Sequence, residues 1–303
     1  MEQALKNRLK FGSMMLVALF SLLWLDYKAQ EWTTTSPDGK YPYGIGGIGL
    51  CVLLLIIMPI AVAELATLFA AEAVRPRRVI AAVGSGLFII HAFLTQFHWF
   101  KPIAASTLAL LVVFIMLGTA LRWGMMKKTQ DAIHVMAGTV LASLYLGGLS
   151  WFFVALRVKH STYGDGSPKF DGSTMVLLMI LLVVKFTDIG AYFGGRTFGK
   201  HKLIPWLSPG KTWEGLFFGL LTASLMGALC APRVSHLTWG KAMIFGAVIG
   251  GIGQLGDLLE SMMKRDAEVK DSGSLVPGFG GVLDIIDSPL LAAPFAYILF
   301  SLF

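Results

Sequence analysis

The residues best suited to chemistry lie near the C-terminus, between two strongly apolar runs. Residues 254–288 read QLGDLLESMMKRDAEVKDSGSLVPGFGGVLDIIDS and combine carboxylates, basic side chains and glycines. Carboxylate oxygens without Cys or a paired His suit Mg²⁺, which takes few carboxylates and keeps waters and substrate phosphates as ligands. The glycine-rich turn before the last apolar run lets backbone N–H groups approach a phosphate. The segment therefore predicts phosphoryl or nucleotidyl transfer at a membrane surface.

A second polar stretch lies at residues 185–215. Lys185 and Asp188 are three residues apart, on one face of an apolar helix. Such a charge pair is costly in a membrane helix unless it has a function or a partner, and a self-neutralising structural pair is the alternative. The basic loop that follows precedes a helix N-terminus and is a candidate anion site. Its Gly-Lys-Thr is no Walker A motif, because the first glycine would fall at Pro205 and no strand is expected before it.

Both stretches resemble the phosphatidate cytidylyltransferases (CDP-diacylglycerol synthases). The C-terminal signature of that family is Ser, two residues, Lys-Arg, four residues, Lys-Asp, then Pro-Gly-His-Gly-Gly and Asp-Arg-x-Asp. The matching positions here are Ser261, Lys264, Arg265, Lys270, Asp271, Pro277, Gly278, Gly280, Gly281, Asp284 and Asp287. Residues 187–215 also resemble the family, without an obvious departure. Two positions of the signature do depart, since Phe279 replaces the histidine and Ile285 replaces the arginine.

The resemblance implies an enzyme that joins CTP to phosphatidate and releases pyrophosphate, with Mg²⁺ as cofactor and room for a second cation. Four helices would bring carboxylates to similar depth at one face of the membrane. The expected metal ligands are Asp257, Asp284, Asp287 and Glu214. The expected catalytic residues are Asp257, Asp284, Lys264, Arg265, Lys270 and Asp271. The expected substrate-binding residues are Lys211, Arg196, Ser208, Gly210, Thr212, Ser261, Gly278, Gly280, Gly281, Asp188 and Lys185.

The composition predicts a membrane protein. Of 303 residues, 55% are hydrophobic and only 14% charged, and the mean hydropathy is +0.70, which excludes an ordinary soluble globular protein. We expect an all-α polytopic membrane protein of about nine transmembrane helices, with the active site at the cytoplasmic ends of the C-terminal ones. The expected spans are 11–27, 44–72, 79–99, 102–122, 132–156, 173–194, 214–232, 240–260 and 284–303. Residues 1–160 would form a scaffold and residues 173–303 the catalytic region of one integrated membrane domain.

The basic residues predict the orientation. With a cytoplasmic N-terminus, the inside segments hold sixteen Lys and Arg against eight outside. Both polar stretches would then face the cytoplasm, where nucleotides are, from the inner (plasma) membrane. The net charge of +7 is largely accounted for by this bias, so it indicates no nucleic acid partner. The first run follows three basic residues as in a signal peptide, but no small-x-small cleavage site follows it, so we expect a retained helix.

Several alternatives stay open from the sequence. Glu64, His91 and His134 lie within expected spans, where a structural hydrogen bond is favoured over a substrate contact. The two departures leave room for a catalytically silent homologue, and the basic loops fit a related CTP-dependent lipid transferase or kinase. An anion transporter is the alternative from another class, although continuous helices speak against it. The sequence leaves undecided a homodimer, the acyl-chain preference and the residues that recognise cytosine.

Overall fold

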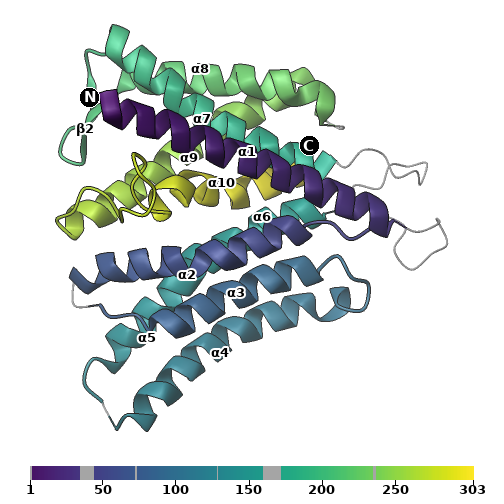
Figure 1. Cartoon of the computed structure of the whole chain (residues 1–303), viewed down its shortest axis with the longest axis vertical. Helices are drawn as coiled ribbons and strands as arrows, with labels where there is room; N and C mark the ends of the chain where they lie inside the picture. The colour runs from purple at the N-terminus through teal and green to yellow at the C-terminus, as the bar shows by residue number, and fades with distance from the viewer. Residues whose placement is uncertain (1, 35–43, 72–73, 128, 160–171, 235–236) are drawn as a thin grey trace. The chain divides into compact units, whose positions relative to one another are not determined.

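The structure is a computed structural model that describes all residues except 1, 35–43, 72–73, 128, 160–171 and 235–236. Its described part consists of helices and one two-stranded sheet (Figure 1). In the first half the elements are α1 (Glu2–Thr33), α2 (Ile48–Ala71), α3 (Arg78–Leu94), η1 (Lys101–Ile103), α4 (Ala104–Met125), α5 (Ala132–Ala142), η2 (Ser143–Gly148) and α6 (Leu149–Val158). In the second half they are α7 (Gly172–Phe198), β1 (Lys202–Ile204), β2 (Ser208–Thr212), α8 (Trp213–Cys230), η3 (Ala231–Arg233), α9 (Trp239–Asp266) and α10 (Leu283–Leu302).

The predicted all-α membrane class is confirmed. Eight spans in the described part of the chain are long and apolar enough to cross a membrane, and α3, with 17 residues, is a further apolar helix. Each corresponds to one of the nine runs expected from the sequence. The helix α3 ends at Leu94, five residues before the end of the expected run, because residues 95–100 form turns.

Two local features were not foreseen. The span Ala132–Val158 contains a π-helical turn, η2, where Gly147 packs so closely on Ser85 that a Cβ would collide with its backbone. The basic loop after α7 contains the antiparallel pair β1–β2, with Lys202 opposite Thr212. Three- and five-residue strands without alternating apolar residues give little signal in a sequence.

The contacts divide the chain into two compact units. Unit 1 comprises Met1–His160 and Asp266–Ile285, and unit 2 comprises Ser161–Arg265 and Ile286–Phe303. Each unit is described by itself below. The expectation of one integrated domain with a scaffold and a catalytic region stays a prediction.

Unit 1 is held by a buried ion pair between its first and last spans. Asp26 of α1 lies 2.6 Å from Nε of Arg157 on α6, and both side chains are completely buried. The Asp26 carboxylate also accepts from the backbone N–H groups of Gly47 and Gly49, at the start of α2. Because helix N-termini leave N–H groups without acceptors, this carboxylate joins three spans.

Unit 2 packs its helices through glycines. The helices α7 and α8 run side by side, and Gly194 of α7 leaves the space that the Phe218 side chain of α8 fills. Gly227 of α8 faces Ala242 of α9 so closely that a Cβ would collide with its carbonyl. Small residues at such positions let membrane helices approach each other closely. The packing fixes the polar ends of α7, α9 and α10 that carry the candidate site.

Candidate active site

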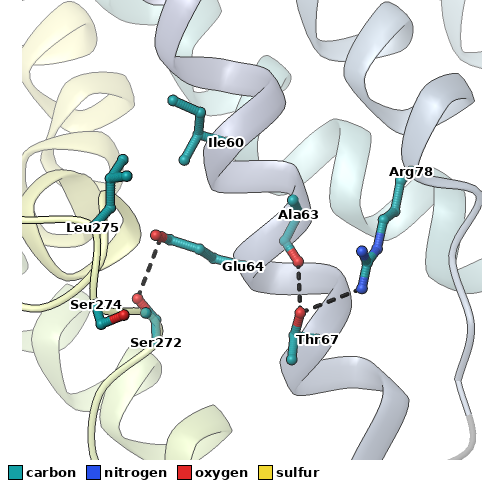
Figure 2. A pocket seen from close by; sticks show the side chains of 9 residues that line it. Ile60, Ala63, Glu64, Thr67, Arg78, Ser272, Ser274 and Leu275 are labelled. Atoms are coloured by element: carbon teal, nitrogen blue, oxygen red, sulfur yellow. Dashed lines mark hydrogen bonds between the residues drawn. The ribbon is translucent and has the colours of Figure 1, made fainter.

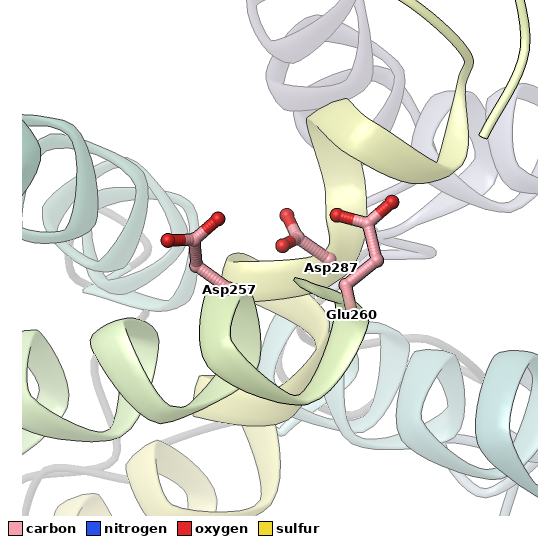
Figure 3. Close-up of side chains that lie close together, drawn as sticks. All are labelled: Asp257, Glu260 and Asp287. Carbon is pink, nitrogen blue, oxygen red and sulfur yellow. The ribbon is translucent and has the colours of Figure 1, made fainter. Parts of the chain in front are cut away.

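Three carboxylates form a compact group at the polar end of α9. Asp257 and Glu260 lie on α9, and Asp287 lies on α10. One oxygen from each can be chosen so that all three lie within 4.8 Å of one another. In Figure 3, Asp287 reaches between the two α9 side chains. Glu260 and Asp287 are buried, whereas the Asp257 side chain is 39% exposed, so the group opens toward solvent on the Asp257 side.

A chain of polar contacts connects this group to β2 and α7. Lys211 of β2 lies 2.5 Å from Oδ2 of Asp257 and donates to the Gln254 side-chain oxygen at 3.0 Å. The amide of Gln254 donates to Asp188 of α7 at 2.7 Å, and Asp188 lies 4.0 Å from Lys185. Lys185 and Asp188 therefore belong to a larger network, and their role in binding substrate stays a prediction.

Lys264 is a further cation beside the group. Its Nζ lies 3.2 Å from Oε2 of Glu260, one helical turn away on α9. Among the described residues, the groups named here are four carboxylates and three ammonium groups, and together they carry one excess negative charge when all are ionised. Buried like charges are costly, and a divalent cation relieves that cost.

The donor set fits Mg²⁺. Each Mg–O bond is about 2.1 Å long, so two oxygens on opposite sides of the ion lie about 4.2 Å apart. The 4.8 Å span of the three carboxylates comes within reach of this value after a small side-chain adjustment. An all-oxygen set with an open side for water or phosphate is the chemistry that Mg²⁺ prefers. Glu260 was not assigned from the sequence, although its i+3 spacing from Asp257 places both on one helical face.

At the N-terminus of α8, Glu214 was expected to bind metal and Thr212 to bind substrate, and both make contacts within the protein. Glu214 accepts from the backbone N–H groups of Lys200 and His201 and lies 2.6 Å from the His201 ring nitrogen. It is not one of the three carboxylates grouped above. The Thr212 hydroxyl caps α8 by accepting from the Gly215 N–H.

Other predicted residues of unit 2 lie nearer the surface. Arg196 is exposed and donates to Tyr192, one turn earlier on α7. Ser208 and Gly210 lie on β2, where Gly210 is exposed and Ser208 half-buried. Ser261 is half-buried on α9 and Arg265 is exposed. The structure therefore brings Lys185, Asp188, Lys211, Asp257, Lys264 and Asp287 into one network, and it places these others around it within unit 2.

The glycine-rich turn belongs to unit 1 and is closely organised. Gly278 and Gly280 have φ angles of +88° and +97°, which other residues adopt only at a cost. Val276 and Gly280 form a β-bridge that closes the turn. Oδ2 of Asp284 accepts from the Gly281 N–H at 2.7 Å and from both the N–H and the hydroxyl of Ser272. Asp284 therefore holds the turn together in this unit, and its role as a metal ligand stays a prediction.

Glu64 of α2 takes part in the same turn, which the sequence did not indicate. Its carboxylate accepts from the backbone N–H groups of Val282 and Leu283, the first amides of α10. Its neighbour Ser272 lines a groove of about 520 Å³ together with Glu64, Thr67 and Arg78 (Figure 2). The preference for a structural hydrogen bond at Glu64 agrees with this contact. The same holds for His91, which contacts the Ala104 carbonyl and the Thr107 hydroxyl of α4.

The remaining signature residues of unit 1 are accessible. Lys270 and Asp271 are exposed in the loop between α9 and α10. Phe279 is 40% exposed, and its ring tip lies 3.2 Å from where a Cβ of Gly12 on α1 would be. The replacement of histidine by phenylalanine thus leaves the backbone of the turn intact and adds an apolar contact with α1.

Fold and site together define a polytopic membrane protein with a carboxylate and lysine network at the polar ends of its C-terminal helices. A sequence profile described as the cytidylyltransferase family matches residues 44–303. The chain belongs to this family, as the resemblance had indicated.

Similarity to individual proteins supports the same family. The chain is 44% identical to the phosphatidate cytidylyltransferase of Haemophilus influenzae over 145 residues, 46% of this chain and 49% of that protein. It is 33% identical to the phosphatidate cytidylyltransferase of Bacillus subtilis over 222 residues, 72% of this chain and 78% of that protein. It is also 36% identical to the uncharacterized protein YnbB of Escherichia coli over 146 residues, 48% of this chain and 49% of that protein. The matches with the Haemophilus and Escherichia proteins thus span about half the length of those relatives.

Proposed function

We propose that this protein is a phosphatidate cytidylyltransferase, which converts CTP and phosphatidate to CDP-diacylglycerol and pyrophosphate. One observation carries the proposal. Lys211, from residues 187–215, and Asp257, from residues 254–288, form an ion pair beside the carboxylate group. Two distant stretches that resemble the same family thus meet in one contact, which supports a shared site where lysines could contact the phosphates of a nucleoside triphosphate.

The proposed reaction is an in-line displacement. An oxygen of the lipid phosphate attacks the α-phosphorus of CTP, the new P–O bond forms, and the bond to the β-phosphate oxygen breaks with release of pyrophosphate. No protein nucleophile is required, because the substrate phosphate supplies the attacking oxygen. Lys211 and Lys264 are held in place by carboxylates, so little side-chain freedom is lost when they meet phosphate oxygens.

The proposed cofactor is Mg²⁺, held by Asp257, Glu260 and Asp287. When bound, it would neutralise phosphate charge as the transferring phosphorus changes partners. Asp284 and Glu214 remain candidates for this ion or for a second cation, on the strength of the sequence alone. Lys270, Arg265 and the glycines of the turn remain candidates for contacts with phosphate.

We place the enzyme in the bacterial inner membrane, with the N-terminus and the active site on the cytoplasmic side. The bias of basic residues supports this orientation. Phosphatidate would enter from the bilayer and CTP from the cytoplasm. A homodimer is left open.

The test is an incubation of membranes that contain the protein with labelled CTP, phosphatidate and Mg²⁺. We expect labelled CDP-diacylglycerol and an equal amount of pyrophosphate. A product that forms only with a lipid alcohol would indicate a CTP-dependent kinase, and the absence of any product would indicate a silent homologue. Asp257→Asn and Asp284→Asn should each lower turnover roughly a hundredfold or more, the scale of a lost transition-state electrostatic contact. Wild-type activity of either variant across a Mg²⁺ titration would remove that residue from the list of ligands.

A further inference from the structure

The side chain of Glu64 caps a helix that begins more than two hundred residues later in the chain. Oε1 accepts from the Val282 N–H at 3.0 Å, and Oε2 accepts from the Leu283 N–H at 2.8 Å. These amides open α10, where N–H groups lack intrahelical acceptors and the helix dipole favours negative charge. Helix caps commonly come from a residue adjacent in sequence, so a cap supplied by another membrane span fixes tertiary structure as well.

The carboxylate of Glu64 also occupies the space beside Gly281. A Cβ at Gly281 would lie 2.6 Å from Oε2 of Glu64, and it would also collide with the Ser272 hydroxyl. Ser272 lies between two acids, with its hydroxyl 3.5 Å from Oε2 of Glu64 and 2.8 Å from Oδ2 of Asp284. Figure 2 shows Glu64 extending from α2 toward Ser272. The end of the glycine-rich turn is thus held between the carboxylates of Glu64 and Asp284.

We propose that Glu64 is a positioning residue for the proposed cytidylyl transfer, which sets the placement of the turn 278–281 and of Asp284 without touching substrate. The proposal rests on the proposed function for its link to catalysis. It gives the span α2, which the sequence assigned to a scaffold, a direct part in shaping the signature segment. All the contacts that carry it lie within unit 1.

The charge of Glu64 matters for a geometric reason. Val282 and Leu283 present two N–H donors, one to each carboxylate oxygen. A glutamine amide offers one acceptor oxygen and one NH₂ donor, so one backbone N–H would face another donor. The desolvated N–H would lose its partner, and the helix terminus would lose a compensating negative charge.

The first experiment compares Glu64→Gln with Thr67→Val in the cytidylyl transfer assay. Thr67 lies one turn away on α2 and lines the same groove, but its hydroxyl bonds to Ala63 and Arg78 rather than to the turn. We expect Glu64→Gln to lower kcat about 10- to 100-fold, the scale seen when a group that orients an active-site residue is removed. Thr67→Val should stay within about twofold of wild type, and activity is compared per folded enzyme because the unpaired backbone N–H also lowers the stability of Glu64→Gln. Equal activity of both variants, per folded enzyme, would overturn the proposal.

The second experiment measures the turn without measuring activity. Lys270 is exposed in the loop that leads into the turn held by Glu64 and Asp284, so trypsin cleavage there reports how tightly the loop is held. Glu64→Gln should accelerate cleavage after Lys270 severalfold in membrane vesicles that expose this face, and Thr67→Val should not. Unchanged cleavage would show that Glu64 does not position the segment.

The third experiment tests direct contact by a double-mutant cycle. Gly281→Ala should accelerate cleavage in the wild-type background, because its Cβ meets both the Ser272 hydroxyl and the Glu64 carboxylate. The same substitution should add less in a Glu64→Ala background, where only the Ser272 hydroxyl remains in its way. Strictly additive effects of the two substitutions on the cleavage rate would contradict a direct contact between Glu64 and the turn. Should the wild type show no cytidylyl transfer, the proposed function fails, while the cleavage measurements still decide whether Glu64 positions the turn.

Discussion

The buried acid Glu260 provides the sharpest test of the candidate metal site, and the perturbation we choose is Glu260→Gln. The side chain of Glu260 is 1% exposed, belongs to the three-carboxylate group and pairs with Lys264. Glutamine keeps its shape and removes its charge. The loss of charge also removes the ion pair between Glu260 and Lys264 and makes the group more positive, which disfavours a cation there.

The expected loss of Mg²⁺ affinity in Glu260→Gln follows from the distances within the carboxylate group. The three carboxylate oxygens lie within 4.8 Å of one another, and we take this span as the outer limit of the distance from Glu260 to an ion held among them. At that distance two opposite unit charges attract by about 3.5 kcal/mol at an effective dielectric constant of about 20. A divalent ion doubles this attraction but gives up hydration, so we take the single-charge figure. Since about 1.36 kcal/mol corresponds to a factor of ten, we expect a loss of roughly 300-fold in Mg²⁺ affinity.

The assay is cytidylyl transfer as a function of Mg²⁺ concentration, at saturating CTP and phosphatidate. Glu260→Gln should shift half-saturation to a Mg²⁺ concentration a few hundredfold higher, with the amount of folded protein preserved. The matched control is Asp266→Asn, since Asp266 is an exposed acid at the end of the same helix. A Mg²⁺ half-saturation that is the same in both variants and in wild type would refute the assignment of Glu260, and an equal shift in both would indicate a general charge effect.

Three further predictions concern stability, orientation and the altered signature. Asp26→Asn should lower the free energy of unfolding by about 3–5 kcal/mol, because it leaves Arg157 charged and buried. Glu31→Gln breaks an exposed pair with Lys28 and should change the free energy of unfolding little. Equal thermal shifts of the two variants would contradict this. In intact cells, a cysteine at Ser208 or Ser274 should be shielded from an impermeant thiol reagent, and a cysteine at His98 should react. The opposite labelling pattern would show that the protein has the opposite orientation in the membrane. Ser274 and His98 are both exposed, so both positions are suitable for labelling. Phe279→His should stay within about tenfold of wild-type activity, a barrier change below about 1.4 kcal/mol. Phe279→Ala should lose activity because it loses the contact at Gly12. An inactive wild type that is rescued by Phe279→His would favour the silent homologue.

The sequence by itself determined the membrane class, the nine apolar helices and the two polar stretches. Each depends on local properties, because a span needs only a run of apolar residues and a turn such as 278–281 needs glycine where φ is positive. The face shared by Lys185 and Asp188 was predictable for the same reason, since helical periodicity places residues three apart together. The family resemblance also came from contiguous stretches, and the profile match to residues 44–303 confirmed it.

Only the tertiary structure decided which polar groups meet. Lys211 could have faced solvent as a positive-inside lysine, yet the packing of α7, α8 and α9 through small residues carries it to Asp257. Glu260 joins the metal candidates because α10 places Asp287 beside it, and Glu214 turns instead to His201. Glu64 reaches amides 218 and 219 positions later in the chain. Such contacts depend on how closely helices pack, and that distance is set by surfaces far apart in the sequence, so no local pattern encodes it.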